Sequence, residues 1–446
     1  MASTKIYRTF GTPTNLDRWT WSAWIKRGAL GVIGYIFEGS SSSAFTAIKF
    51  ETDNTLLFGN YNGGYLGRLI TNRKFTDIAA WLHIVAVWDS DNATAGDRMK
   101  LYVNGVEETS FSTDTNPSSG EACQMSSGND CLLGVHQLIH DYWNGGILSH
   151  VQFVDGLALA PTEFGETDAT SGIWKIKTSP TVTYGTNGFF LKMEDRTNLD
   201  LDSSSNGHTF TTAGTLTATY DNPSNNFSTL NPLNMPTSAK PTFSQGNNTV
   251  VSQSAAGKNF GGTSTLGMVS GKWYTEFKPV SVSNGSIIGI TGEAGEDARQ
   301  NFGVGESEDG YGYVHNGNKR NNNSETSYGN TYTDGDIIGV ALDLDNLKIY
   351  YSKNGVWENS GVPTSGATGT GAAFTVTAVN LTDEGHYAFF CSDYATGTTT
   401  FNANFGNGYF ATTAITSAGT NASGNGDFEY DVPTGYTALS TKGLDT

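Results

Sequence analysis

The chain has 446 residues, with 43 Asp and Glu against 25 Lys and Arg, and a formal net charge of −18. Such an acidic chain repels phosphate backbones, which excludes nucleic acid as an expected partner. Charged residues make up only 15% of the chain, aromatic residues 12% and glycine 55 positions, a composition that indicates an ordered, turn-rich β protein and not a disordered one.

The first part of the chain reads as strands separated by Gly, Asn, Ser or Asp, without helical periodicity. Their alternation of apolar and polar residues predicts half-buried strands. One helical turn is expected from Ala160 to Phe164, where Pro161 opens it and Gly165 ends it. The expected strands cover residues 19–26, 45–50, 55–59, 147–156 and 188–195.

Two long hairpins of the same design lie far apart in the sequence, at 81–105 and 336–355. Each has an apolar strand, an acidic turn and a second strand, and each then ends in Asn-Gly. Asn104-Gly105 and Asn354-Gly355 can adopt the positive φ that a type I′ turn requires. The sequence therefore predicts two β domains of related architecture.

Between these hairpins, residues 195–241 are rich in Asn, Ser, Thr and Pro, which indicates an extended connector. Because β-sandwiches often reach about 200 residues, we expect two domains, at 1–194 and 242–446. Strands of the second domain are expected at 271–280, 286–292, 301–305, 310–317, 373–379, 386–394 and 399–410.

The chain shows neither the apolar core of a signal peptide near its first residues nor a run of ~20 apolar residues. We therefore expect synthesis in a cytoplasm and no membrane insertion. Cys391 lies in an apolar strand and is expected to be buried. Cys123 and Cys131 bracket a short polar loop, so they form either a disulfide or two free thiols.

Segments of the first domain resemble laminin G-like, concanavalin A-like jelly rolls: WTWSAWIKRG from Trp19, WLHIVAVWD from Trp81, MKLYVNGVEE from Met99 and GGILSHVQFVDGLAL from Gly145. The second domain resembles SPRY domains through GKWYTEFKP from Gly271, DGYGYVHNG from Asp309, GDIIGVALDLDNLKIYYSKNGVW from Gly335 and FNANFGNGYF from Phe401. The resemblance implies an all-β chain with two concanavalin A-like jelly-roll sandwiches in tandem.

This pairing of domains is similar to structural proteins of tailed bacteriophages, especially marine ones. The similarity implies a non-enzymatic virion protein, such as a tail fibre, capsid fibre, or decoration or adhesion component. Its expected partners are other virion proteins and a host cell-surface glycan or protein, and its expected location is the virion. Symmetric assembly is common, so a homo-oligomer is expected, with a trimer as the best guess. The alternatives are a virion-associated polysaccharide depolymerase and an intracellular SPRY-type scaffold.

The residues of a catalytic centre are not found in the sequence. Asp343 and Asp345 have the alternate spacing of glycosidase carboxylates, but they lie at a hairpin turn and lack a third acid. His136 and His140 have the spacing of zinc ligands on a helix, yet Gln137 stands where a zinc protease has its glutamate. Nucleophile-elbow and phosphate-loop motifs are missing as well. We therefore expect no enzyme activity.

No cofactor is expected, with calcium as the one alternative, because some laminin G-like domains bind it. Asp195, Asp200 and Asp202 place carboxylates close together in the sequence, as a calcium loop would. However, Ser205 stands where an EF-hand loop needs glycine. The prevailing interpretation is an acidic connector.

Ligand binding is therefore expected from aromatic side chains beside amides in loops, because sugar rings stack on aromatic faces and amides supply directional hydrogen bonds. Two clusters fit this pattern. The first comprises Tyr142, Trp143 and Asn144, and the second Tyr311, Tyr313, His315 and Asn316.

Overall fold

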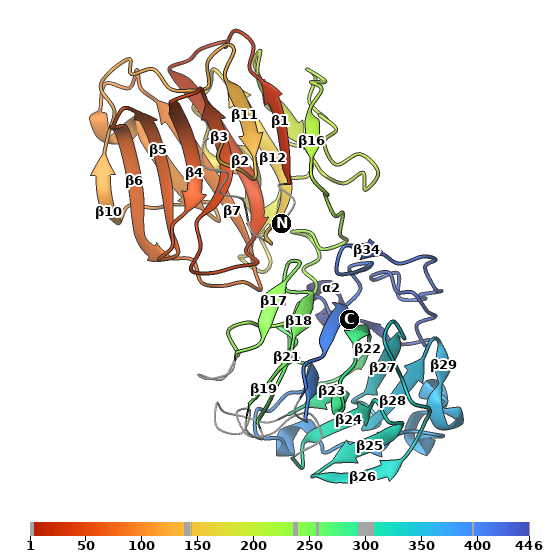
Figure 1. The fold of residues 1–446 in the computed structure, drawn as a ribbon. Coiled ribbons are helices and arrows are strands. Elements are labelled where there is room, and N and C mark those ends of the chain that lie inside the picture. Colours follow the sequence, from red (N-terminus) through yellow and green to blue (C-terminus); the bar gives the residue numbers. More distant parts are fainter. Residues whose placement is uncertain are drawn as a thin grey trace. The chain divides into compact units, whose positions relative to one another are not determined.

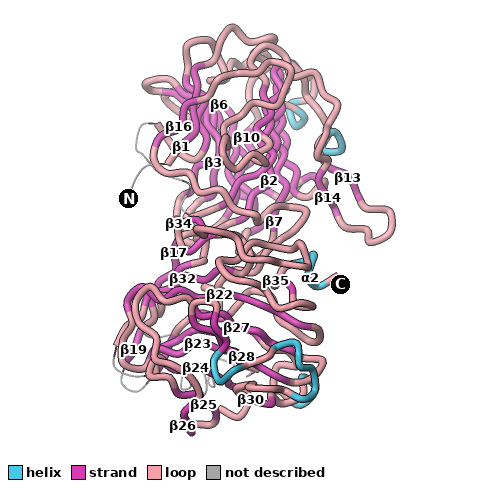
Figure 2. The backbone as a smooth tube through the Cα atoms, turned by 90° about the vertical axis from the view of Figure 1, so that its right-hand side faces the viewer, coloured by secondary structure: helices cyan, strands magenta, loops and turns pink. Residues whose placement is uncertain are grey.

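The structure is a computed structural model that describes residues 4–137, 143, 145–234, 240–255, 258–292, 307–394 and 397–445. The chain divides into two compact units, Met1–Ala218 (unit 1) and Thr219–Thr446 (unit 2). Strands dominate both, and helices are short (Figures 1 and 2). The all-β prediction is therefore confirmed.

The described part of unit 1 has two main antiparallel sheets and a separate hairpin. In spatial order, the first sheet contains β10 (Phe111–Thr115), β6 (Tyr65–Lys74), β5 (Thr55–Asn62), β4 (Ala44–Phe50), β3 (Gly34–Ser40), β11 (Asp130–Leu133), β1 (Lys5–Thr9) and β16 (Thr211–Ala213). The second contains β15 (Phe189–Leu191), β12 (Ile147–Asp155), β2 (Arg18–Lys26), β7 (Trp81–Asp89), β8 (Met99–Val103) and β9 (Val106–Glu107). The hairpin pairs β13 (Gly165–Thr167) with β14 (Trp174–Ile176), and short 3₁₀ turns cover Ala95–Asp97 and Pro161–Glu163.

Unit 2 likewise has two main sheets among its described residues. One follows the order β17 (Thr242–Ser244), β18 (Thr249–Val251), β32 (Thr400–Asn404), β22 (Lys272–Ser281), β27 (Ile338–Asp343), β28 (Lys348–Lys353) and β29 (Val356–Trp357), with β30 (Phe374–Thr375) on β28 and β35 (Thr437–Ala438) on β22. The other follows β21 (Gly262–Thr263), β31 (Ala388–Asp393), β23 (Ser286–Thr291), β24 (Gly310–Val314), β25 (Asn318–Asn321) and β26 (Ser324–Ser327).

The remaining elements of unit 2 are small. They are the hairpins β19 (Gln253–Ala255) with β20 (Lys258–Phe260) and β33 (Tyr409–Phe410) with β34 (Thr413–Ala414), the 3₁₀ turns Glu358–Ser360, Pro363–Thr368 and Val379–Leu381, and α2 (Thr441–Leu444). The predicted strand at 301–305 lies outside the described residues.

Both units fill the space between their sheets with aromatic and aliphatic side chains. In unit 1, Trp19 and Trp21 of β2 meet Trp88 of β7 in one continuous core. In unit 2, Phe277 of β22 and Phe389 of β31 belong to a second core. A domain of this length buries roughly 70% of the surface that its unfolded chain exposes.

The two sheets that contain the long hairpins, with β7 and β8 in unit 1 and β27 and β28 in unit 2, are buried on both faces. This differs from the prediction of half-buried strands. Strands β2 and β7 are buried along nearly their whole length. The outward side chains Val85 and Val87 are covered by Phe164 and Tyr184, which lie beyond the strands in the sequence. A local alternation pattern could not show this cover, since the covering segment comes from elsewhere in the chain.

The predicted Asn-Gly turns are confirmed at both hairpins. Asn104 and Gly105 have φ of 49° and 79°, and Asn354 and Gly355 have φ of 48° and 79°. In each turn the asparagine Oδ1 accepts a backbone N–H from the facing strand at 2.8 Å, from His83 or Ile337. The two units thus share the same asparagine side-chain hydrogen bond at the same position of their hairpins.

The predicted connector, residues 195–241, falls partly within each unit. Strand β16 pairs with β1, and Phe210 packs into the core of unit 1. Leu230 is fully buried in the core of unit 2. The polar composition of this segment reflects its many turns.

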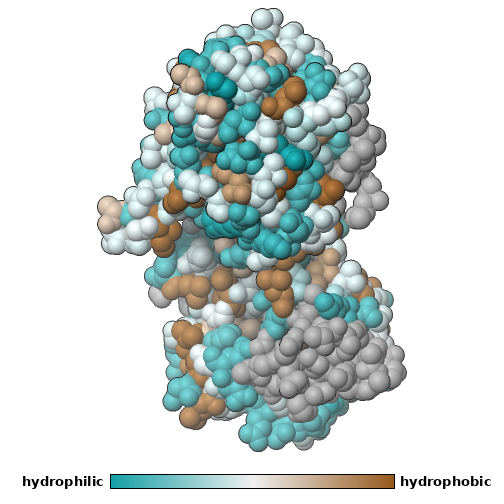
Figure 3. Space-filling model, turned by 90° about the vertical axis from the view of Figure 1, so that its left-hand side faces the viewer, coloured by the Kyte–Doolittle hydropathy of each residue, from teal (hydrophilic) through white to brown (hydrophobic). Residues whose placement is uncertain are grey.

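The surface of unit 1 carries little contiguous apolar area on the face drawn in Figure 3. There, hydrophobic side chains of the described residues form small groups separated by hydrophilic ones. Within the described residues, none of the helices has the length and hydrophobicity needed to cross a membrane.

Candidate functional site

Unit 2 contains a polar cavity of about 230 Å³. Four chain segments meet there: the stretch before β17, the loop after β21, the end of β23 and the approach to β31. Its lining is almost wholly hydrogen-bonding, and includes Asn231, Asn234, Thr263, Thr265, Glu384 and His386. Small-ligand sites are usually concave and mostly apolar with a few polar groups, so this polar lining suits a ligand that binds through hydrogen bonds.

Backbone and side-chain hydrogen bonds fix the amide side of the cavity. The Asn231 N–H donates to the Thr263 carbonyl at 2.8 Å, and Asn234 Nδ2 donates to Thr263 Oγ1 at 3.0 Å. The Thr265 N–H donates to the Thr229 carbonyl at 2.8 Å. These bonds hold the segment before β17 against the loop after β21, so the site is preorganised.

The opposite side of the cavity carries an acid and an imidazole. His386 Nε2 lies 3.1 Å from Glu384 Oε2, and both side chains retain some exposure, 35% and 18%. The ring packs on Gly267, where an added Cβ would lie 2.3 Å from His386 Cδ2. The cavity can therefore offer hydroxyl, amide, carboxylate and imidazole groups to a polar ligand.

No local pattern in the sequence marks this cavity, because its lining residues are spread from Asn231 to Ala388. Two of them, Asn231 and Asn234, lie in the predicted connector. The density of Asn and Pro there was the only local signal.

The second predicted aromatic cluster is wrong for Tyr311 and Tyr313. Both lie on β24 and point into the core of unit 2, with 4% and 0% of their surface exposed. The Tyr313 ring stacks on Tyr351 at 5.5 Å, and its hydroxyl donates to the Asn330 carbonyl. Neither ring face is open to a ligand.

The other two residues of that cluster lie just after β24. His315 is half-buried, and burial lowers the pKa of its imidazole. Asn316 is exposed, and its amide donates to Glu325 Oε2 at 3.3 Å. They remain accessible, but without the tyrosine rings they form no aromatic site.

Of the first predicted cluster, Tyr142 and Asn144 lie outside the described residues. Trp143 is described, and its ring lies 5.8 Å from the ring of Phe50, packed against the core of unit 1. Its backbone N–H donates to the Gly134 carbonyl at 2.9 Å. The Trp143 ring is thus packed against the core, contrary to the prediction of a stacking platform.

The alternative of a disulfide between Cys123 and Cys131 is wrong, since both are free thiols. Cys123 Sγ accepts the indole N–H of Trp19 at 3.2 Å, which directs it into the core. Burial raises the pKa of each thiol to about 12. Cys391 is buried, as predicted.

The predicted calcium residues serve the backbone of their own loop. Asp202 is buried, and its two oxygens accept backbone N–H groups of Phe190, Ser204 and His208 at 2.8 to 2.9 Å. Asp195 accepts the N–H and hydroxyl of Thr197. Asp200 is half-buried. Within the described ranges, no group of three or more His, Cys, Asp or Glu is placed to hold a metal ion.

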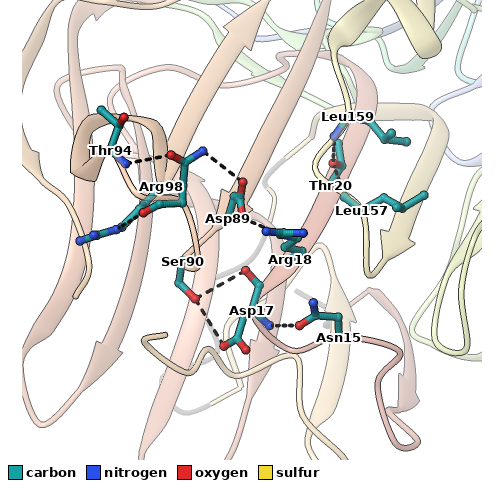
Figure 4. Close-up of polar contacts among 11 residues, drawn as sticks. Asn15, Asp17, Arg18, Thr20, Asp89, Ser90, Thr94, Arg98, Leu157 and Leu159 are labelled. Atoms are coloured by element: carbon teal, nitrogen blue, oxygen red, sulfur yellow. Dashed lines mark hydrogen bonds and ion pairs between the residues drawn. The ribbon is translucent and has the colours of Figure 1, made fainter. Parts of the chain in front are cut away.

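The acidic side chains Asp17 and Asp89, at one end of the second sheet of unit 1, also form hydrogen bonds or ion pairs with neighbouring residues (Figure 4). Asp89 accepts Arg18 Nε at 2.8 Å and Asn92 Nδ2 at 3.2 Å. Ser90 Oγ lies 3.4 Å from Asp17 Oδ1 and 3.5 Å from the Asp17 carbonyl. These contacts tie β2 to β7 and to the loop that follows β7.

One arrangement resembles a nucleophile with its base and acid. Ser149 Oγ lies 2.8 Å from His150 Nδ1, and His150 Nε2 lies 3.3 Å from Glu194 Oε1. However, Ser149 is buried, Glu194 is more than half exposed, and burial lowers the pKa of His150 to about 4, too low for an efficient base near neutral pH. The positive φ of His150 belongs to a β-bulge in β12.

The remaining catalytic spacings are structural. Asp343 is buried and pairs with Lys272 Nζ at 2.9 Å, while Asp345 accepts the Gly271 N–H at 3.0 Å. His136 Nδ1 lies 2.5 Å from Glu38 Oε2. His140 lies outside the described residues.

Comparison with known families supports the resemblance of each unit. Residues 4–164 match the model of the concanavalin A-like lectin/glucanases superfamily, and residues 273–407 match the model of the SPRY domain. The chain therefore combines a laminin G-like, concanavalin A-like domain with a SPRY domain, both β-sandwich folds. These two matches suggest a binding or interaction module.

Among solved structures, the human HERC1 SPRY domain is 19% identical, with a TM-score of 0.30, covering 39% of this chain and 96% of its own. A SAP-like pentraxin from Limulus polyphemus is 23% identical, with a TM-score of 0.28, covering 36% of this chain and 72% of its own. A further human SPRY domain is 15% identical, with a TM-score of 0.25, covering 35% and 90%. None of the curated proteins matches the chain.

Proposed function

We propose that this chain is a non-enzymatic structural protein of a bacteriophage virion, a tail fibre, capsid fibre, or decoration or adhesion component. It contacts a host-surface glycan or protein, or another virion protein. The pairing of a laminin G-like with a SPRY domain supports this proposal, through its similarity to phage structural proteins.

The polar cavity of unit 2 is the observation that carries the binding function. Hydroxyl and amide groups around one carboxylate and one imidazole suit a hydroxyl-rich or otherwise polar ligand group, which needs directional hydrogen bonds. The volume of about 230 Å³ fits a single sugar residue or a polar side chain and not a long segment.

Binding to host envelopes tests the proposal. The full chain is titrated onto purified host envelope fragments, in parallel with Asn234→Ala and His386→Ala. Asn198→Ala, at an exposed position of unit 1 away from the cavity, is the matched control. We expect both cavity variants to weaken binding by about tenfold, as expected for loss of one hydrogen bond of about 1.4 kcal/mol. Equal binding by the parent chain, the two cavity variants and the control would show that the cavity does not bind the host envelope.

The alternative of a polysaccharide depolymerase predicts a different result. Incubation with host polysaccharide would then release new reducing ends in proportion to time, whereas a binding protein releases none. The scaffold alternative predicts absence from purified particles. The proposed location predicts a fixed copy number in particles, with hundreds for capsid decoration and a handful for a tail appendage.

Assembly into a homo-oligomer, specifically a trimer, belongs to the same proposal. Sedimentation equilibrium of the purified chain gives the subunit number directly. A monomer across the concentration range would leave assembly to other virion proteins.

A further inference from the structure

The outer face of the first sheet of unit 1 carries aromatic side chains that take no part in the main core. Strands β4, β5 and β6 lie side by side (Figure 1), and their register pairs Phe45 with Tyr61 and Tyr61 with Tyr65. With Tyr35 of β3, these rings form a separate cluster, here called the aromatic platform. It has no role in the unit 2 cavity.

The rings of the platform are held in defined orientations. Phe45 and Tyr61 stack with centroids 5.2 Å apart and planes 13° apart, and Tyr65 meets Tyr61 nearly at right angles at 5.4 Å. Tyr65 lies over Gly59, where a Cβ would come within 2.9 Å of its ring. Tyr61 and Tyr65 are half-buried, so each residue keeps part of its surface open to solvent.

The anionic groups beside the platform already have partners. Glu38 is fully buried, and its carboxylate lies 2.5 Å from His136 Nδ1 and accepts the Gln137 N–H at 3.2 Å. Glu51 pairs with Lys49 at 2.9 Å, and the Lys49 ammonium lies 5.0 Å from the Tyr35 ring. Both carboxylates are thus already engaged by neighbouring groups of unit 1.

The Arg68 side chain, by contrast, forms no ion pair with a carboxylate in the described part of the chain. Its guanidinium lies 4.4 Å from the centre of the Tyr65 ring. No carboxylate among the described residues lies within ion-pair distance of it, although the chain has a net charge of −18. Arg73, on the same strand, instead pairs with Glu108 at 2.8 Å.

We propose that the aromatic platform binds an acidic glycan, with a pyranose ring against Tyr61 and Tyr65 and a sugar carboxylate on Arg68. The apolar C–H face of a pyranose matches an aromatic ring, and a planar guanidinium matches a carboxylate in two parallel hydrogen bonds. Stacking on Tyr65 holds the guanidinium in place before the ligand arrives, which reduces the entropy lost on binding. The platform supplies stacking and the positive charge from neighbouring positions of one sheet.

The test uses the full chain and two purified probes, an oligoglucuronate and the neutral oligoglucose of the same linkage and length. Isothermal titration is expected to show binding of the oligoglucuronate and at least tenfold weaker binding of the neutral probe. Arg68→Gln is expected to lower the affinity for the acidic probe about tenfold, the lower end of the effect of a charged hydrogen bond. Arg73→Gln, which removes an equally charged residue of β6, is expected to bind like the parent chain.

Four results would overturn the proposal: no binding of either probe, equal affinity for both, equal loss in Arg68→Gln and Arg73→Gln, or tighter binding of an oligoglutamate peptide than of the oligoglucuronate. Tyr61→Leu checks the stacking and is expected to weaken binding while Arg68 is intact. Thermal melting of each variant separates loss of binding from loss of folding. Because the unit 2 cavity is also proposed to take a sugar residue, His386→Ala is titrated with the same probe. Loss of affinity in Arg68→Gln but not in His386→Ala assigns binding to the aromatic platform, whatever the outcome of the test of the proposed function.

Discussion

Trp174 donates its indole N–H to Nδ1 of His83 across 3.0 Å, which joins the β13–β14 hairpin to the central strand β7. His83 is fully buried, and its Nε2 lies 2.8 Å from Ser22 Oγ. Because Nδ1 accepts a hydrogen bond, the proton of the neutral ring must be on Nε2. The ring also stacks on Trp24 at 4.9 Å. Protonation of His83 at Nδ1 would place a second N–H directly against the indole N–H of Trp174 inside the fold.

This arrangement predicts that unit 1 loses stability in acid. Burial lowers the pKa of His83 from 6.5 to about 3. Between these values the unfolded chain binds the extra proton and the folded one does not, so stability falls as the pH drops from 6.5 toward 3, by roughly 1.4 kcal/mol per pH unit. Urea unfolding followed by tryptophan fluorescence reports mainly on unit 1, which holds seven of the nine tryptophans.

The variant His83→Gln separates this effect from general acid sensitivity. It is expected to be less stable at pH 7, since Trp174 loses its acceptor, but to lose less stability between pH 6.5 and 4 than the parent. His386→Gln, in unit 2, should keep the parent's slope. An unchanged slope in His83→Gln would mean that other groups, such as His150, set the acid sensitivity.

The Asn-Gly turns predict equal effects in the two units. Asn104→Ala and Asn354→Ala each lose the acceptor for a backbone N–H and force alanine into positive φ. We expect each to destabilise its unit by roughly 1 to 3 kcal/mol. Glycine at the same positions loses the acceptor without the strain and should cost less. Equal costs for alanine and glycine in chemical denaturation would argue against a contribution from φ.

These turns were predictable from the sequence because Asn and Gly determine the backbone locally. The fate of Tyr311 and Tyr313 was not. A strand was predicted at 310–317, and β24 does pair with β23 on one side and β25 on the other, but the tyrosine rings were expected to face a ligand and not the core. Which face of β24 is buried depends on partners more than 20 residues upstream in β23. The unit 2 cavity was missed for the same reason.

Cys123 and Trp143 illustrate a second limit. The spacing of Cys123 and Cys131 permits a disulfide, but Cys123 bonds to Trp19, 104 residues away. In the sequence Trp143 stands beside polar residues, yet its ring packs on Phe50. In both cases a distant core residue determines the side-chain direction, and no local pattern encodes it.

The hydrogen bonds of Glu276 predict that its substitution destabilises one segment of unit 2, the one near Phe428. The buried Glu276 carboxylate accepts the backbone N–H groups of Glu429 and Tyr430 at 2.8 and 2.9 Å, which fastens the segment near Phe428 to β22. Glu276→Gln places an amide N–H against one of these donors. We expect a loss of about 1 to 3 kcal/mol and faster amide hydrogen exchange at residues 428–432. Glu308→Gln, on an exposed side chain, is the control and should leave exchange there unchanged.

The same carboxyl predicts a pH effect opposite to that of His83. Burial raises the pKa of Glu276 from 4.5 to about 7. Between these values the folded chain holds the proton and the unfolded one does not, so this group lowers stability as the pH rises from 4.5 to 7. Hydrogen exchange of the Tyr430 amide, corrected for its intrinsic pH dependence, should therefore speed up over this interval in the parent and not in Glu276→Gln.

Calcium is expected to have no effect on stability. Asp202 uses both oxygens on the backbone N–H groups of Phe190, Ser204 and His208, and a metal ion would have to displace these bonds. Asp195 is similarly engaged with Thr197. Calcium at about 5 mM, above the 10⁻⁴–10⁻³ M range of weak extracellular sites, should leave the melting temperature within error of an EDTA-treated sample. Asp202→Asn should lower it equally in both samples, because the aspartate acts as a cap for its loop. A melting temperature raised by calcium in the parent but not in Asp202→Asn would instead identify a metal site at this loop.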